Sequence, residues 1–476
     1  MLIVRPLLIM PVIAYRRPDA RRDGTTPSDR DTPMNTVASA NVSGVEQAVM
    51  TKVAWRILPF LMLLYFVAFV DRVNIAFASL QMNADVGLSS VAYGIGASAF
   101  FVSYFLFEVP SNFVLSKVGP RRWIARILMT WGLVSGAMMF VSGEKSFYVL
   151  RFLLGMAEAG FFPGIVVYLS RWFTASYRGR VTGIFIVAIP LSGLIGGPIS
   201  GLILDGMNGV SGLRGWQWMF LLEATPAVAL GIGCLWWLAD HPADVAWLSP
   251  DQKDRLERML ESERRALDSE ARYPLSAAFA NRAVLLLAGT LFCIVFGTTG
   301  IAFFLPQIIK SFGYSNTAVG FLSAVPYLAG VIAMVSWARH SDTHRERVAH
   351  LATATLFGAL GFIALAFLLH VHWAAMIALC FAAMGVYASN ALLWTLPSEL
   401  MTGTAAAVAI GVINSLANLS GVIAPSLLGW SRQVSGGFAL PAWIFAGFLI
   451  LGTVLTVLFS CTPMFTASRR ALGKAV

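Results

Sequence analysis

Apolar stretches of about 20 residues recur along this chain and constrain its fold more than any other feature. A helix that crosses the hydrocarbon core of a bilayer needs about 20 apolar residues, and only helices and closed barrels satisfy their backbone groups there. Charged residues make up 12% of the sequence, whereas soluble globular chains carry about 25%. A large soluble protein would lack polar surface, so the sequence predicts an all-α membrane protein.

Twelve such runs predict twelve transmembrane helices. The runs lie near residues 57–79, 92–115, 123–142, 147–172, 181–204, 216–238, 283–305, 317–338, 349–369, 373–396, 405–429 and 441–462. A polar insert separates the sixth run from the seventh, so the helices divide into two six-helix halves. The predicted parts are a disordered tail (1–50), an N-terminal half (51–238), a central cytoplasmic loop (239–281), a C-terminal half (282–462) and a tail (463–476).

The central loop carries the signals of an amphipathic helix. Ser249, Pro250 and Gln252 have the spacing of an N-cap, a first helical residue and a capping box. Leucine and methionine residues from Leu256 to Leu267 then fall on one face. We expect this helix to lie on the bilayer surface or against the bundle.

The distribution of positive charge predicts the orientation. The net charge is +10, and 28 of the 34 Lys and Arg residues fall in the tails and in the loops on one side of the predicted bundle. Loops rich in Lys and Arg stay in the cytoplasm. Both termini are therefore expected to be cytoplasmic, in a bacterial inner membrane.

The two halves resemble each other, which indicates an internal repeat. Ser192-Gly193 with Pro198 and Gly201 in the fifth run recurs as Ser420-Gly421 with Pro425 and Gly429 in the eleventh. Small residues let helices approach closely. Transporters built from repeated halves bind substrate between the halves, near the middle of the membrane.

Asp71 and Arg72 lie deep in the first run and are candidate functional residues, because ionisable groups are costly inside a bilayer. Adjacent helical residues point about 100° apart. Arg72 can therefore face a cavity and bind a substrate carboxylate with two hydrogen bonds, while Asp71 faces a neighbouring helix. The alternative is a purely structural ion pair with another helix.

Arg151 and Glu158 lie seven residues apart in the fourth run and share a helix face. A carboxylate whose burial is balanced by a nearby arginine can gain and lose a proton near neutral pH. Since all six histidines fall in loops or at the ends of runs, proton coupling is assigned to carboxylates, with Asp71 and Glu158 as the candidates. The alternative is permanent pairing of Glu158 with Arg72 or Arg151.

Other polar residues mark the expected gate and cavity walls. The cytoplasmic gate is expected to contain Glu108, Arg121, Arg122, Asp342, Arg345, Arg347 and Glu399. The cavity walls are expected to contain Tyr104, Trp394, Asn414 and Asn418, for which packing alone is an equal explanation. Glu223 in the sixth run is interpreted as a structural partner.

No nucleotide-binding loop, zinc or haem spacing, or nucleophile elbow occurs in the sequence. ATP-driven transport and membrane hydrolysis therefore have no support. The chain is predicted not to be an enzyme, and no cofactor, metal or nucleic acid is expected.

Several strings resemble the anion:cation symporter branch of the major facilitator superfamily, over nearly all of 52–462. They are Asp71-Arg72-Val73-Asn74-Ile75, Tyr104-Phe105-Leu106-Phe107-Glu108-Val109-Pro110-Ser111-Asn112, Arg151-Phe152-Leu153-Leu154-Gly155, Glu158-Ala159-Gly160-Phe161-Phe162-Pro163-Gly164 and Ile413-Asn414-Ser415. Members of this branch take up organic anions, and many are driven by protons. The resemblance implies that Arg72 binds the substrate carboxylate, that Asp71 and Glu158 carry or relay the proton, and that Tyr104, Trp394 and Asn414 line the cavity.

The sequence departs from this pattern at several positions. Ser116 stands where the superfamily has an acid, Ala338 where it has glycine, and Phe69 where a tyrosine is frequent. The first change weakens the inner-gate ion pair of the N-terminal half. Few hydroxyls surround Trp394, which favours a less hydroxylated or aromatic acid over a sugar acid.

We therefore expect proton-coupled uptake of a small organic anion, such as tartrate, a sugar acid or an aromatic acid, by alternating access. Its partners are the anion, the proton and the bilayer, and the expected state is a monomer. One alternative is a proton-driven exporter of hydrophobic compounds, which the paired Asp71-Arg72 and Arg151 disfavour. Another is a transporter-like sensor that binds its ligand without moving it.

Overall fold

The computed structural model describes residues 33–174, 177, 181, 188–269, 274–344, 346–397 and 403–466. Every regular element in these ranges is a helix. Twelve helical segments within them are long and apolar enough to cross a membrane. The predicted all-α membrane fold with twelve transmembrane helices is confirmed.

The N-terminal half contains the first six membrane segments. Its helices are α2 (Pro33–Val86), α3 (Ser90–Val118), α4 (Pro120–Ala137), α5 (Glu144–Glu158), α6 (Phe161–Ser170), α8 (Ala188–Gly206) and α9 (Gly215–Trp237). Short 3₁₀ turns at Met138–Phe140 and Val210–Gly212 follow α4 and α8. Because α5 and α6 together form one segment, the fourth span is a broken helix.

The C-terminal half follows a connection that carries two short helices. The connection holds the 3₁₀ turn Pro242–Asp244, α10 (Pro250–Ser269) and α11 (Leu275–Ala280). The six membrane helices of this half are α12 (Arg282–Lys310), α13 (Asn316–His344), α14 (Arg347–Leu368), α15 (His372–Leu393), α17 (Gly403–Ser435) and α18 (Ala439–Ser460).

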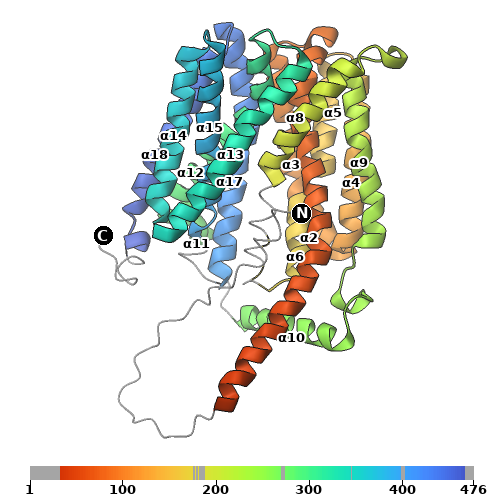
Figure 1. The fold of residues 1–476 in the computed structure, drawn as a ribbon, viewed down its shortest axis with the longest axis vertical. Coiled ribbons are helices and arrows are strands. Elements are labelled where there is room, and N and C mark those ends of the chain that lie inside the picture. The colour runs from red at the N-terminus through yellow and green to blue at the C-terminus, as the bar shows by residue number, and fades with distance from the viewer. Residues whose placement is uncertain are drawn as a thin grey trace.

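The two sets of helices stand side by side, and α10 lies across one end of the bundle (Figure 1). We call this end the α10 end and the opposite one the far end. The chain alternates between the ends, so α2 starts and α18 finishes at the α10 end (Figure 1).

The first helix begins earlier than the sequence predicted. Residues 33–50 were assigned to a disordered tail, but α2 starts at Pro33. Val49, Met50 and Val53 are buried in the same cluster as Leu256 of α10. Helix α2 therefore reaches into the segment predicted as a tail, and its apolar side chains near residue 50 gain a packing partner from a segment far along the chain.

Helix α10 is tied to the N-terminal half. Ser249 and Gln252 form the two reciprocal hydrogen bonds of a capping box, at 3.2 and 3.3 Å. The Gln252 side chain also accepts a hydrogen bond from Lys52 of α2 at 3.0 Å. Leu256 is fully buried, so the apolar face of α10 packs on the bundle.

The repeated glycines form two equivalent contacts between the halves, α3 with α17 and α8 with α13. A Cβ atom added to Gly429 of α17 would lie 2.3 Å from the Ser90 carbonyl oxygen of α3. One added to Gly201 of α8 would lie 2.6 Å from the Asn316 carbonyl oxygen of α13. Only glycine fits such backbone contacts, which explains why the same small residues recur in both halves.

Hydrogen bonds join the halves at the far end. The hydroxyl of Ser426 on α17 donates to that of Ser98 on α3 at 2.7 Å. Asp205 of α8 accepts from the backbone and hydroxyl of Thr317 on α13, at 2.7 and 2.9 Å. In the described ranges, the hydrogen bonds between the N-terminal and C-terminal halves all lie in the part of the bundle nearer the far end. The two halves are therefore held together by hydrogen bonds at the far end.

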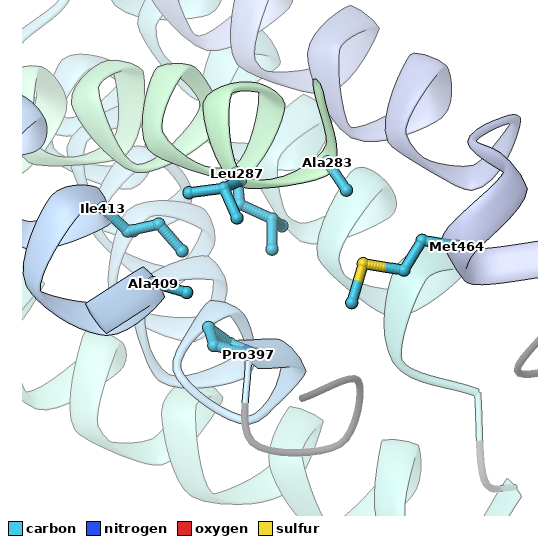
Figure 2. A pocket seen from close by; sticks show the side chains of 7 residues that line it. Ala283, Leu287, Pro397, Ala409, Ile413 and Met464 are labelled. Atoms are coloured by element: carbon cyan, nitrogen blue, oxygen red, sulfur yellow. The ribbon is translucent and has the colours of Figure 1, made fainter. Parts of the chain in front are cut away.

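A small apolar pocket lies inside the C-terminal half, at the α10 end (Figure 2). Figure 2 shows Ala283, Leu287, Pro397, Ala409, Ile413 and Met464 around it. It encloses about 10 Å³, and a water molecule needs roughly that much room. No organic ligand fits there.

Candidate functional site

Two of the predicted site residues form an ion pair in the core of the N-terminal half. The Arg72 guanidinium on α2 donates to a carboxylate oxygen of Glu158, the last residue of α5. The Glu158 side chain is 2% exposed and that of Arg72 is 23% exposed. Of the two arginines that the sequence left open as partners of Glu158, the structure selects Arg72.

A break in the fourth span positions Glu158. Helix α5 ends at Glu158, Ala159 is extended, and Gly160 has φ +87° in the left-handed region before α6 begins. The freed carbonyl of Ala159 accepts a hydrogen bond from the Ser111 hydroxyl of α3 at 2.7 Å. Ends of broken helices are recurrent ion and substrate sites in transporters.

Sequence reasoning missed this break and expected one continuous helix over 147–172. The signal was present in Gly160 and Pro163, two helix-breaking residues within one turn. A Cβ atom at position 160 would lie 2.2 Å from the Ser111 hydroxyl oxygen. Glycine is thus required both by the backbone angle and by the close approach of α3.

Aromatic rings surround the Arg72 guanidinium. Its central carbon lies 4.9 Å from the ring centre of Phe69, 5.5 Å from that of Phe100 and 5.7 Å from that of Tyr104. Each contact is within the range of a cation–π interaction. Tyr104 therefore lies beside Arg72. Phe100 was missed, because an aromatic residue in an apolar run looks like packing.

Arg151 is a second buried cation beside the same ring. Its side chain is 1% exposed, and its guanidinium carbon lies 4.8 Å from the ring centre of Phe100. Its Nε donates weakly to the Gly96 carbonyl at 3.4 Å, while Nη2 has no partner. In the part of the chain that the structure describes, no carboxylate forms an ion pair with it. A buried cation without a directly paired carboxylate is costly, so this position suits an incoming anion.

Asp71 points away from Arg72 toward α4, as the 100° separation of adjacent residues predicts. Its carboxylate accepts hydrogen bonds from Trp131 Nε1 at 2.6 Å, from the Ser135 hydroxyl, and from Asn74 Nδ2 at 3.1 Å. The side chain is 2% exposed. The sequence did not identify Trp131 and Ser135 as partners of Asp71, because a polar side chain in an apolar helix does not reveal which residue it contacts.

The predicted cavity residues of the C-terminal half are half-buried. Trp394 follows the last residue of α15, while Asn414 and Asn418 lie one turn apart on α17. Among the described residues, no hydrogen bond or ring contact joins them to Arg72 or Arg151. The structure thus brings the N-terminal site residues into contact with one another, and among the described residues no such contact connects these three to them.

The expected gate residues lie at the α10 end. Arg347 forms an ion pair with Asp342 and donates to the Ser341 hydroxyl at 3.3 Å. Glu108 is half-buried inside α3, well before its end at Val118, and Arg122 is exposed. Arg345 and Glu399 lie outside the described residues.

The N-terminal half has an acid at this end, although Ser116 replaces the usual one. Asp240, just beyond α9, accepts a hydrogen bond from the Arg121 backbone at 3.1 Å and lies 3.7 Å from the Arg171 guanidinium. The Arg121 guanidinium donates to the Leu235 carbonyl. Asp240 was missed because it lies more than a hundred residues from Arg121 along the chain.

Comparison with known proteins defines the class. Residues 61–425 match the Major Facilitator Superfamily. A relative from Agrobacterium vitis whose name proposes tartrate transport is 49% identical over 420 residues, covering 88% of this chain and 96% of the relative. A quinolone resistance transporter from Acinetobacter baumannii is 40% identical, with 86% and 94% covered.

The fold is also that of solved transporters. A crystal structure of a D-xylose-proton symporter matches with a TM-score of 0.67 and 15% identity, over 85% of this chain and 97% of the other. The chain belongs to the major facilitator superfamily. It is a multi-pass membrane transporter and not an enzyme.

Proposed function

We propose that this transporter takes up a small organic anion together with a proton, by alternating access. The observation that carries the proposal is the arrangement of two arginines beside the Phe100 ring, one half-buried and one buried, with the Glu158 carboxylate paired to the first. Arg72 is held by Glu158, whereas Arg151 has no carboxylate partner in the described chain. One arginine is thus paired with a carboxylate that can be protonated, and the other arginine has no paired carboxylate. Such a site suits an anion whose binding depends on protonation.

The coupling follows from competition for Arg72. Protonation of Glu158 removes its charge and releases the Arg72 guanidinium, which then binds a substrate carboxylate with two hydrogen bonds. Loss of the proton restores the ion pair and expels the anion. Since proton and anion act on the same contact, each changes the affinity for the other. Asp71 is proposed to take part as a second proton-binding acid.

The substrate class is a small carboxylate. Two guanidinium groups beside one ring suit a compact acid with two carboxylates, in line with the tartrate proposed for the 49% identical relative. The rings of Phe69, Phe100 and Tyr104 also provide apolar walls for an aromatic acid. Trp394, Asn414 and Asn418 are proposed to close the site when the halves rearrange.

An exporter is the alternative with a specific observation in its favour, namely the relative named for quinolone resistance. The buried Arg151 and the half-buried Arg72 would repel a cationic drug. Uptake of an anion therefore agrees better with the site. Measuring substrate exchange distinguishes a non-transporting sensor from an importer and from an exporter.

The proposed location is a bacterial inner membrane, with the α10 end and both termini in the cytoplasm. Most Lys and Arg residues lie at that end or in the tails. The far end then faces the periplasm and is closed by the contacts between the halves. The proposed state is a monomer.

Counterflow in proteoliposomes tests the function. Vesicles loaded with unlabelled tartrate, a sugar acid or an aromatic acid should accumulate the same labelled acid transiently. A proton gradient directed into the vesicles should increase this accumulation. Binding without exchange would identify a sensor. Exchange of apolar drugs with no exchange of acids would establish the exporter instead.

The inner gate is expected to depend on Asp342 more than on Ser116. Asp342 is paired with Arg347, whereas the Ser116 hydroxyl donates to the Phe113 carbonyl of its own helix at 2.7 Å. Asp342→Asn should slow initial uptake several-fold, while Ser116→Ala should stay near the wild-type rate. Labelled uptake at matched expression measures both. Equal effects would refute this asymmetry between the loops.

A further inference from the structure

A polar stripe runs along α2 from Asp71 toward the far end. Asp71, Asn74, Gln81 and Asp85 are spaced so that they share one helix face. The Gln81 amide donates to the Leu204 carbonyl of α8 at 3.0 Å. This face of α2 therefore meets α8 and α9, on the side of the N-terminal half away from Glu158.

The outer part of the stripe contacts α9. The Gln81 side chain accepts from the Trp216 backbone at 3.2 Å, and Asp85 accepts from Trp216 Nε1 at 2.9 Å. Asp85 also pairs with Arg214 at 2.9 Å. The stripe thus begins at charged groups on the far end and leads inward to a buried acid.

Glu223 of α9 is a second buried acid beside this stripe. It is 6% exposed, and its Oε1 accepts a hydrogen bond from the Ser200 hydroxyl of α8 at 2.7 Å. Its Oε2 has no hydrogen-bond partner. No Lys or Arg in the described ranges forms an ion pair with it. An ionised carboxylate in that setting is strongly disfavoured, so the neutral acid is the stable form.

Asp71 is also buried, at 2% exposed, but its carboxylate has more hydrogen-bond partners than that of Glu223. It accepts three hydrogen bonds, one of them from Asn74, which also faces Glu223. Hydrogen bonds to the charged form offset part of the cost of burying it, so Asp71 holds a negative charge more readily than Glu223, whose Oε2 has no hydrogen-bond partner. Asp71 and Arg151 are the ionisable groups that face this region, from α2 and α5. Two nearby acids with such different environments define a proton donor and a proton acceptor.

We propose that Glu223 is a proton-carrying residue of the transport cycle that shares a proton with Asp71. In this conformation the proton resides on the Glu223 carboxyl and Asp71 is a carboxylate. Transfer of that proton leaves Glu223 charged and Asp71 neutral, with no other bond changed. Glu223 lies on the far-end side of Asp71, so it is the first buried acid that a proton from the periplasm meets. The inference rests on the proposed proton coupling.

Infrared spectroscopy tests the protonation without any substrate. The purified wild-type protein at neutral pH should show the carbonyl stretch of a buried protonated carboxylic acid, and Glu223→Gln should lack it. Ser200→Ala keeps the acid but removes its hydrogen bond, so the band should persist at a shifted frequency. A band unchanged in both variants would overturn the proposal. If Glu223→Gln does not fold, the Ser200→Ala shift alone decides it.

Transport separates proton carriage from structural support. Gln keeps the shape of the acid and can still accept from Ser200, so a structural role predicts normal accumulation in Glu223→Gln. The proposal predicts at least a 10-fold loss of accumulation driven by a pH gradient, with counterflow near wild type. Normal accumulation would overturn it. Absence of counterflow for every acid in the wild type would instead reject the proposed function, and the infrared result would still stand.

Discussion

Replacement of Arg72 by lysine is expected to remove most uptake, although the positive charge is kept. The guanidinium pairs with Glu158 and lies between the rings of Phe69, Phe100 and Tyr104. A planar guanidinium binds a carboxylate through two parallel hydrogen bonds and stacks on aromatic faces, whereas an ammonium does neither as well.

The expected size follows from the lost contact. A hydrogen bond to a charged group contributes about 1.5–3 kcal/mol, so losing one should weaken binding by about 10- to 100-fold. Initial uptake rates over a range of anion concentrations measure the change. Arg265→Lys is the matched control, because Arg265 is 78% exposed on α10 and is assigned to neither the site nor the gate. Wild-type affinity in Arg72→Lys would exclude Arg72 from substrate binding.

The twelve membrane segments were predictable because the bilayer selects for a property of the sequence itself. A spanning helix must be apolar over its whole length and must satisfy its own backbone. The two equivalent contacts between the halves were likewise marked by Gly201 and Gly429, since close helix approach excludes larger side chains. The signals lie within each segment, so no knowledge of neighbours was needed.

Pairings within the site were not predictable in the same way. Glu158 had two arginines at reasonable positions, and only the break before Gly160 fixes which one it meets. The partners of Asp71 come from α4, and Asp240 reaches Arg121 across more than a hundred residues. Such contacts depend on how helices rotate and pack against each other, which hydropathy does not encode.

Glu158→Gln is expected to abolish accumulation driven by a proton gradient while keeping substrate exchange. Gln has the shape of the protonated acid but cannot lose a proton. In the proposed cycle, deprotonated Glu158 pairs with Arg72 again and thereby links anion release to proton release. In the variant, Arg72 stays available to the anion, so the carrier still cycles when substrate is present on both sides, but the pH gradient no longer drives net movement.

Proteoliposomes loaded with unlabelled substrate provide the measurement. Entry of labelled substrate is followed with and without an imposed pH gradient, and Glu158→Gln should respond to the substrate gradient alone. Glu144→Gln is the matched control, because Glu144 is exposed at the start of the same helix α5. If Glu158→Gln still accumulates label in response to the pH gradient, Glu158 is not the coupling acid. Asp71, which lies on the other side of α2 and next to Glu223, then becomes the residue through which the proton acts.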